Sequence, residues 1–425
     1  MNTVDRVIQT LAGAGLLLFC TLIFGADLPR AKPEQLGLSS ERLARIGALL
    51  KADVESKKIP GAVLLVARHG KIAHFEAIGK QDPAASAPMT PDSIFRLYSM
   101  TKPITSVAAM MLAEEGRINL DQPVSMYLPE FAKMTVGVEK PDADGKPMLE
   151  TVPARRQMTI QDLLRHSSGL TYGFFGPGLV KKAYVDAGLL IGDPSNAEFS
   201  VALAKLPLAY QPGTTWDYSH STDVLGRLIE VVSGKTLYQF MRERILDPLG
   251  MRDTSFYVTE PARQARLAEP FADDRSIGVG ATINNPRSGG KWESGGGGMV
   301  GTAMDYARFL QMLLNRGSLD DMRYLGPRTL DYMTADHNGS SITPGPLYLP
   351  GPGYGFGLGV AVRRGTGESA AAGAAGDYYW GGAGGTYMWV DPKNDMFVVF
   401  MMQSPKQRVH YRALLRDMVY AAIVK

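Results

Sequence analysis

Ser99 and Lys102 stand three residues apart at the start of an apolar run, and together they have the chemistry of an activated nucleophile. Residues 104–115 have helical periodicity, and residues three apart on a helix share a face, so the two side chains are expected to meet. A serine hydroxyl is a weak nucleophile until a base takes its proton. A lysine serves as that base when burial or a nearby charge lowers its pKa. The pair therefore predicts a serine that becomes acylated.

The position of Ser99 also favours the negative charge that develops on the carbonyl oxygen of a substrate during nucleophilic attack. Ser99 lies near the predicted N-terminus of a helix, where the helix dipole is positive, and its backbone N–H is a candidate oxyanion donor. A second Ser-x-x-Lys pattern, from Ser288 to Lys291, lies among glycines after Pro286, with no predicted helix to set its geometry. We interpret that second match as coincidence and Ser99 as the nucleophile.

Two later segments place the Ser-x-x-Lys pattern in a wider order of motifs. Residues 211–220 read Gln-Pro-Gly-Thr-Thr-Trp-Asp-Tyr-Ser-His, and residues 379–386 read Tyr-Trp-Gly-Gly-Ala-Gly-Gly-Thr. This order resembles that of the β-lactamase-like serine hydrolases, which include class C β-lactamases, DD-peptidases and family VIII carboxylesterases. Those enzymes carry Ser-x-x-Lys at a helix start, Tyr-x-Asn on a loop and Lys-Thr-Gly on an edge strand. The resemblance runs from about residue 33 to the C-terminus and includes residues 162–170 and 297–302.

The resemblance implies a role for each matching residue. Ser99 is the acylated nucleophile, Lys102 is its proton partner and Tyr218 shuttles the proton between nucleophile, leaving group and water. The backbone N–H groups of Ser99 and Ala383 form the oxyanion hole. Whether Lys102 or Tyr218 is the base in each step stays open, because such a pair titrates as a unit.

Two departures from the motifs narrow the substrate class. Trp380 replaces the lysine of Lys-Thr-Gly and so removes a cation that helps bind the carboxylate of β-lactams, and Gly381 and Gly382 complete the third motif. His220 replaces the asparagine of Tyr-x-Asn, which holds a substrate amide. Glycines let a strand backbone approach a ligand closely, so Trp380, Gly381, Gly382 and His220 are expected to line the substrate site. Trp-Gly-Gly is similar to the pattern of family VIII carboxylesterases, which cleave small esters.

Three alternatives to an esterase stay open at this point. The first is a β-lactamase, D-amino-acid amidase or DD-peptidase-like enzyme of the same superfamily. The second is a non-catalytic relative that binds peptidoglycan or a partner, against which the intact Ser99, Lys102 and Tyr218 argue. The third makes His220 the base of a Ser-His-Asp triad. The chain contains no Gly-x-Ser-x-Gly elbow, which argues against an α/β-hydrolase.

The elements that must position these residues come from both ends of the chain. Apolar runs at 61–68 and 71–79 predict one hairpin, and runs at 386–390 and 396–401 predict another. Helical periodicity appears at 39–50 and in the last segment, where Tyr411, Leu415 and Val419 share a stripe. The middle of the chain predicts helices separated by long loops, at 104–115, 159–165, 223–232 and 302–315, with a loop at 343–359.

This pattern predicts an α/β (α+β) fold of the β-lactamase/DD-peptidase type. An antiparallel sheet is made from both termini and flanked by helices, and a mostly helical region is inserted between its halves. The catalytic domain is expected over residues 27–425. Its α/β part covers about 33–100 and 345–425, and its helical part covers about 101–344.

Composition limits the partners and cofactors. The net charge is +3 and no basic stripe is interleaved with aromatic residues, so nothing points to nucleic acid. The remaining histidines form no metal-binding motif; they are His69, His74, His166, His337 and His410. We expect no metal, no cofactor and a small-molecule ester or amide substrate.

The N-terminus predicts export. Residues 11–24 are apolar and follow Arg6, which is typical of a signal peptide over 1–26 with cleavage after Ala26. An uncleaved anchor is the alternative, and only then would the protein be attached to a membrane. Cys20 is the single cysteine of the chain, so a cleaved chain can form no disulfide. The expected location is periplasmic or secreted.

Overall fold

The two ends of the chain meet in one eight-stranded sheet in the computed structural model, which describes residues 27–278 and 281–425. The strand order is β14-β15-β16-β17-β18-β1-β2-β3, and each strand is antiparallel to its neighbours. β1 and β18 join the N-terminal and C-terminal halves, with Leu65 opposite Val399. The predicted sheet from both termini is therefore confirmed. Its strands are β1 (Gly61–Arg68), β2 (Lys71–Asp82), β3 (Ala87–Pro88), β14 (Tyr354–Phe356), β15 (Ala361–Arg363), β16 (Tyr378–Gly381), β17 (Tyr387–Asp391) and β18 (Met396–Met402).

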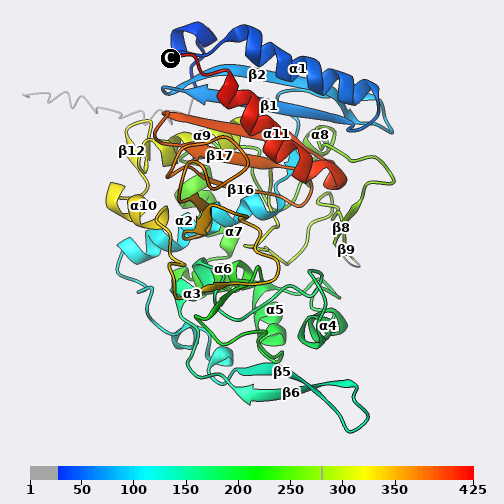
Figure 1. Cartoon of the computed structure of the whole chain (residues 1–425), viewed down its shortest axis with the longest axis vertical. Helices are drawn as coiled ribbons and strands as arrows, with labels where there is room; N and C mark the ends of the chain where they lie inside the picture. The colour runs from blue at the N-terminus through cyan, green and yellow to red at the C-terminus, as the bar shows by residue number, and fades with distance from the viewer. Residues whose placement is uncertain (1–26, 279–280) are drawn as a thin grey trace, which may run out of the picture.

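Helices cover both faces of this sheet. α1 (Ser40–Glu55) and α11 (Arg408–Ala421) lie side by side on one face, at the top of Figure 1. α2 (Thr101–Glu114) and α9 (Ala303–Leu314) belong to the core on the other face. Every residue of β1 is buried, because both of its faces are covered. This explains why its sequence is continuously apolar and does not alternate.

The inserted region contains helices and one long hairpin. Its main helices are α3 (Ile160–Leu164), α4 (Leu179–Asp186), α5 (Asn196–Leu203), α6 (Ser221–Ser233) and α7 (Leu237–Met241). The hairpin of β5 (Thr135–Pro141) and β6 (Pro147–Pro153) lies at the end of the molecule farthest from α1 (Figure 1). The sequence analysis did not anticipate this hairpin, although Asp144-Gly145 at its tip is a common turn signal.

Short elements connect these parts. They are α8 (Pro261–Gln264), α10 (Pro327–Met333), β4 (Phe95–Arg96), β7 (Thr215–Trp216), β8 (Ser276–Gly278), β9 (Ala281–Thr282), β10 (Val300–Gly301), β11 (Ser318–Leu319), β12 (Met322–Arg323) and β13 (Thr343–Pro344). β13 and β14 both fall inside the expected loop at 343–359, which is therefore only partly irregular.

Capping side chains define where several helices begin. The Ser39 side chain accepts a hydrogen bond from the backbone N–H of Arg42, and Thr302 does the same for Asp305. Such caps satisfy N–H groups that have no partner within the helix. α2 begins at Thr101, earlier than the predicted 104, because a 3₁₀ turn over Tyr98–Met100 leads directly into it. Ser99 is thus in the turn and Lys102 is in the helix.

The expected signal peptide over residues 1–26 lies outside the described residues. Within the described part of the chain, no helix is both long and apolar enough to cross a membrane.

Candidate active site

Ser99 sits in a main-chain bend that hydrogen bonds with two distant segments hold in place. The preceding residue, Tyr98, has φ +47°, a conformation that is uncommon outside glycine and often found at functional sites. The Tyr98 hydroxyl accepts a hydrogen bond from the N–H of Asn284 at 3.1 Å. On the other side, the Leu97 N–H donates to the carbonyl of Met299 at 2.9 Å. Tyr98 and Met100 are buried while Ser99 is partly exposed, so the bend presents Ser99 to solvent.

Lys102 is completely buried on the first turn of α2. Its Nζ donates to the carbonyl oxygen of Gly296 at 2.6 Å and to the hydroxyl of Tyr172 at 3.1 Å. It also lies 4.4 Å from the centroid of the Tyr218 ring. No hydrogen bond joins Lys102 to the Ser99 hydroxyl among the described residues, although the two residues are three positions apart in the chain. Catalytic hydrogen bonds often form only when substrate is present.

Tyr218 connects the helical region to the sheet. Its side chain is 5% exposed, and its hydroxyl accepts a hydrogen bond from Nε1 of Trp380 at 3.2 Å. Trp380 lies on β16, so the tryptophan that replaces the expected lysine contacts the motif tyrosine directly. The His166 ring packs against Tyr218 with 4.8 Å between ring centroids. Burial and the charge of Lys102 lower the pKa of His166 well below its usual value, which keeps that ring neutral.

The chain after β16 makes a tight turn beside the nucleophile. The Gly382 N–H donates to the carbonyl of Thr386 at 2.8 Å, and a Cβ at Gly382 would collide with the carbonyl oxygen of Leu97. A glycine at this position therefore lets the turn approach the segment that carries Ser99. The N–H of Ala383 donates to no acceptor in the described part of the chain, which leaves it available to a ligand. Ser99 and Ala383 line the same cavities.

His220 is hydrogen-bonded to Asp223, whose carboxylate also interacts with the charge of Lys102. Nδ1 of His220 lies 2.9 Å from Oδ2 of Asp223. Oδ1 of Asp223 accepts hydrogen bonds from the Ser294 hydroxyl at 2.5 Å and from the Gly296 N–H at 3.0 Å. Burial alone would raise the pKa of Asp223, but the hydrogen bond and charge of His220 and the charge of Lys102 lower it. The carboxylate is therefore ionised. His220 makes no hydrogen bond to Ser99 among the described residues.

Four of these groups were not identified from the sequence as part of the site: Tyr172, Gly296, Asp223 and His166. Tyr172 follows the segment 162–170, and Gly296 lies in the run of glycines at 295–298. Burial, together with the charges of Asp223 and Tyr218, raises the pKa of Tyr172 well above its usual value. Tyr172 is therefore a neutral phenol that accepts from Lys102. For Tyr172 and Gly296, the sequence signal that could have identified them was their position next to the family-like segments 162–170 and 297–302.

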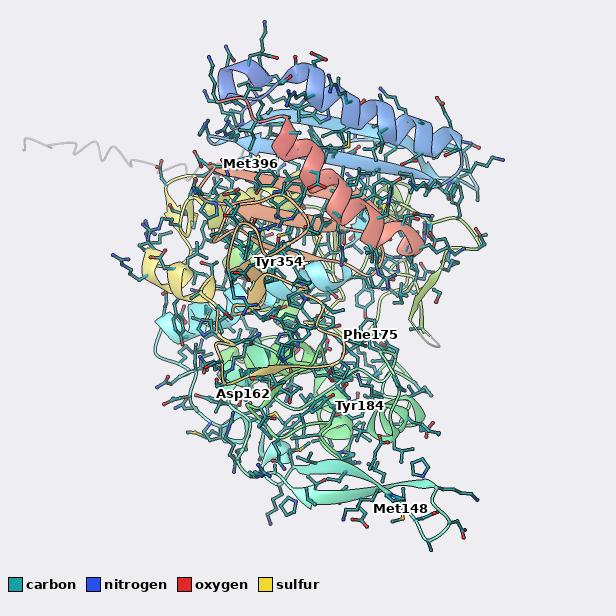
Figure 2. The ribbon with its side chains drawn as sticks, in the orientation of Figure 1. Met148, Asp162, Phe175, Tyr184, Tyr354 and Met396 are labelled. Atoms are coloured by element: carbon teal, nitrogen blue, oxygen red, sulfur yellow. The ribbon has the colours of Figure 1, made fainter. Side chains whose placement is uncertain are left out.

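Two cavities meet at Ser99 and share Phe175, Tyr218 and Ala383 with it. The first cavity, of about 480 Å³, lies toward the sheet and α11, and its lining includes Trp380 and Gly381. The second cavity, of about 520 Å³, lies toward the helical region and is lined by His220. In Figure 2, Tyr354 of the first cavity and the shared Phe175 lie in the middle of the molecule, between α1 and the β5–β6 hairpin. Gly382, which the sequence predicted to line the substrate site, lies in the adjacent turn and lines neither cavity.

Size alone does not identify this site. A larger cavity, of about 950 Å³, lies beside β2 and residues 269–275, and its described lining includes Arg96 but neither Ser99 nor Tyr218. The second Ser-x-x-Lys pattern lies outside the described helices, and Ser288 and Lys291 are both exposed and line neither of the two cavities at Ser99. Among the described residues, no group of three or more histidine, cysteine, aspartate or glutamate side chains is arranged to hold a metal ion.

Comparisons with known proteins find relatives that match most of the chain. A family model described as Beta-lactamase matches residues 46–421. An uncharacterised protein of Mycobacterium tuberculosis is 37% identical over 352 residues, which cover 81% of this chain and 86% of that protein. Esterase EstB of Burkholderia gladioli is 34% identical over 415 residues, which cover 92% of this chain and 98% of EstB. The solved structure of EstCE1, titled a hydrolase with promiscuous acyltransferase activity, has a TM-score of 0.73 at 28% identity and covers 89% of this chain and 98% of its own.

Proposed function

The chain belongs to the beta-lactamase family of serine hydrolases, and on that premise we propose that it is a carboxylesterase that forms an acyl-enzyme on Ser99. The observation that carries the proposal is the junction of two cavities at Ser99, with the buried Lys102 and Tyr218 beside it. A nucleophile at such a junction has room for the acyl portion of an ester on one side and for the alcohol portion on the other.

In the proposed first half-reaction, Ser99 Oγ attacks the ester carbonyl carbon. Its proton passes to the pair formed by Lys102 and Tyr218, and the N–H groups of Ser99 and Ala383 stabilise the oxyanion. The ester C–O bond then breaks, and the pair returns the proton to the departing alcohol. The distance of 4.4 Å from Lys102 Nζ to the Tyr218 ring supports treating the two groups as one proton-handling unit.

In the second half-reaction, water takes the place of the alcohol. The same pair removes a proton from water as its oxygen attacks the acyl carbon, and the proton returns to Ser99 Oγ as the acid leaves. The hydrogen bonds from Lys102 to Gly296 and Tyr172 hold its Nζ in place beside Tyr218. This cycle requires no cofactor and no metal.

The substrate class follows from the third motif. Trp380 supplies an aromatic surface and a hydrogen bond to Tyr218 where a β-lactam-binding enzyme has a cation. The proposal therefore favours esters over β-lactams and D-peptides. The name of Esterase EstB, which the chain matches over nearly its whole length, supports the same choice.

Hydrolysis of p-nitrophenyl butyrate tests the proposal directly. We expect strong turnover by the wild type, its loss in Ser99→Ala, and full activity in the matched control Ser288→Ala, which alters the exposed serine of the second Ser-x-x-Lys pattern. A chromogenic cephalosporin measured beside it should be cleaved weakly. Cephalosporin turnover far above ester turnover would favour the β-lactamase alternative. A folded wild type that neither turns over ester nor reacts with a covalent serine probe would favour a binding protein.

Acyl transfer to an alcohol is a second candidate activity, and the two cavities are the observation that favours it. If the acyl group occupies one cavity, the other stays open to an acceptor larger than water. EstCE1, whose structure this chain resembles, is described as a hydrolase with promiscuous acyltransferase activity. The measurement is the yield of transfer ester when a short primary alcohol is added to the same assay. Unchanged acid yield at high alcohol concentration would exclude this activity.

A further inference from the structure

Three arginines on one stripe of α11 line the first cavity. Arg408, Arg412 and Arg416 are spaced four residues apart, so they follow one another along a single face of the helix. The cavity they line also contains Ser99. The described lining of this cavity includes no aspartate and no glutamate, so the three guanidinium groups dominate its charge.

Arg416 is neutralised within the protein. Its Nη1 and Nη2 lie 3.0 Å and 3.2 Å from the carboxylate of Asp377, and its Nε donates to the Tyr387 hydroxyl at 2.7 Å. Asp377 also accepts from Nε of Arg363 at 2.7 Å, so this one carboxylate serves two arginines. Asp377 is completely buried behind the cavity wall and leaves no charge for the other two arginines of the stripe.

Arg408 and Arg412 have no such counter-ion. No carboxylate oxygen in the described part of the chain lies within 4.0 Å of either guanidinium group. Nη1 of Arg408 donates to the carbonyl of Pro405 at 2.8 Å, and Nη2 of Arg412 donates to the carbonyl of Gly382 at 3.1 Å. Nε of Arg412 is buried with no hydrogen-bond partner among the described residues. Burial, and next the charge of Arg412, lower the pKa of Arg408, and the charge of Asp274 only partly opposes this shift.

A partly buried cation without a counter-ion is unfavourable, and an anion from solution would relieve the cost. A guanidinium group presents a planar set of donors that matches a carboxylate, to which it binds in a bidentate manner. The rest of the lining is uncharged and largely apolar, and it includes the aromatic rings of Tyr354, Tyr379 and Trp380. The preferred ligand therefore combines an apolar body with a carboxylate.

We propose that Arg412, with Arg408 beside it, binds a carboxylate carried by the ester substrate, so that anionic esters are the preferred substrates of this enzyme. The proposal rests on the proposed esterase activity and names its substrate class. On the strand side of the cavity, Trp380 stands where the Lys-Thr-Gly motif has a lysine. Arg412 supplies a cation to the same cavity from α11. Because Arg412 bonds to Gly382, next to Ala383, it also lies beside the proposed oxyanion hole.

The carboxylate can belong to either portion of the ester, and two matched substrate pairs distinguish these sources. In the acyl pair, the adipic acid mono-4-nitrophenyl ester is compared with its terminal carboxamide. In the alcohol pair, 4-carboxyphenyl butyrate is compared with 4-carbamoylphenyl butyrate. Each pair differs in charge with nearly constant shape, so the ratio of kcat/KM values within a pair reports recognition of the carboxylate.

We expect the wild type to prefer the anion by about tenfold or more in one of the pairs, the effect of a hydrogen bond to a charged group. The ratio should fall to about one in Arg412→Met and be partly retained in Arg412→Lys. Arg364→Met, which alters an exposed arginine outside both cavities, is the matched control and should keep the wild-type ratio. A preference in the acyl pair assigns the first cavity to the acyl portion, and a preference in the alcohol pair assigns it to the alcohol portion.

Two results would overturn the proposal: no preference for the anion in either pair, or a preference that survives in Arg412→Met. A purely structural role of Arg412 through Gly382 would lower kcat/KM for both members of a pair equally and leave the ratio unchanged. Calorimetric binding of the anionic esters and their carboxamides to Ser99→Ala gives a second readout that needs no turnover. An enzyme that hydrolyses neither member of any pair contradicts the esterase proposal, whereas tighter binding of the anion to Ser99→Ala would still support the carboxylate site.

Discussion

The two cavities that meet at Ser99 are alike in size and aromatic content but opposite in charge. The first is lined by Arg408, Arg412 and Arg416 and by no described acidic residue. The second is lined by Asp193 and Asp223 and by no described lysine or arginine. Ser99, the proposed nucleophile, thus stands between a basic and an acidic cavity. Charged clefts concentrate ligands of opposite charge. This difference should therefore orient the proposed anionic substrate, with its carboxylate in the first cavity.

The difference also separates the parts of the site that perform chemistry from those that select substrate. Ser99, Tyr218 and Ala383 line both cavities, and a change in the shared catalytic groups should therefore affect every ester equally. The arginines belong to one cavity alone, so changes there should alter the choice between esters. The predictions that follow test this division, from the largest expected effect to the smallest.

Lys102→Met should remove catalysis without changing selectivity. Lys102 is buried and its side chain is about as long as that of methionine, so the fold should survive. The loss of a proton-transfer group costs about 10²–10⁴-fold in rate. We expect kcat/KM to fall by that amount for the anionic ester and for its carboxamide alike. Lys291→Met, at the exposed lysine of the second Ser-x-x-Lys pattern, is the control and should retain activity. A variant that loses only anionic esters would contradict the division.

Asp223→Asn should destabilise the protein in a pH-dependent way. The carboxylate is buried and bonded to His220, Ser294 and Gly296, and removing one partner of a buried charged network costs about 3 kcal/mol. The pKa of Asp223 is lowered in the folded protein, so its stabilisation is fully present above the ordinary carboxyl pKa and is lost as the pH falls through the folded value. The deficit of the variant in denaturant unfolding should therefore be largest at neutral pH and shrink on acidification.

A control for this variant lies in the same cavity. Asp193 is exposed, and its oxygens accept the N–H of Lys291, so Asp193→Asn should change the free energy of unfolding by only about 0.5 kcal/mol or less. Equal stabilities of Asp223→Asn and Asp193→Asn at neutral pH would show that the second cavity does not depend on its buried charge.

Salt should have a smaller effect, confined to anionic esters. Steering by the partly exposed Arg408 and Arg412 is screened as the Debye length falls from about 30 Å at 0.01 M ionic strength to about 10 Å at 0.1 M. We expect kcat/KM for the preferred anionic ester to decline by about two- to fivefold over that range, while the carboxamide changes little. The measurement is the salt dependence of both members of the pair. Parallel declines would assign the effect to the catalytic groups and not to the first cavity.

Much of the fold followed from local patterns. The continuous apolar run at 61–68 and its partner at 396–401 predicted strands, and the structure pairs them as β1 and β18 at the centre of the sheet. The β5–β6 hairpin did not follow, because its strands are largely exposed and carry no clear apolar alternation. The 3₁₀ turn at Tyr98–Met100 was likewise missed, since three residues give too little periodicity to predict it.

The sequence by itself indicated Ser99 and Lys102 as a candidate pair, because they are three residues apart at the start of an apolar helical run. The structure places Ser99 in the 3₁₀ turn before α2 and Lys102 in the first turn of that helix. The motif order likewise indicated Tyr218 and Ala383. Only the tertiary structure decided what each group touches. Lys102 bonds to Tyr172 and Gly296, 70 and 194 residues later in the chain, and Tyr218 bonds to Trp380, 162 residues later.

The charge of the site was decided in the same way. The helical stripe of Arg408, Arg412 and Arg416 is visible in the sequence, but its meaning depends on where the acidic residues fold. Asp377 forms an ion pair with Arg416. Arg408 and Arg412 have no carboxylate partner among the described residues and line the cavity that contains Ser99. Local propensity depends on neighbours within a few residues, whereas the pairing of charges depends on which distant side chains pack together, and that is settled only when the core forms.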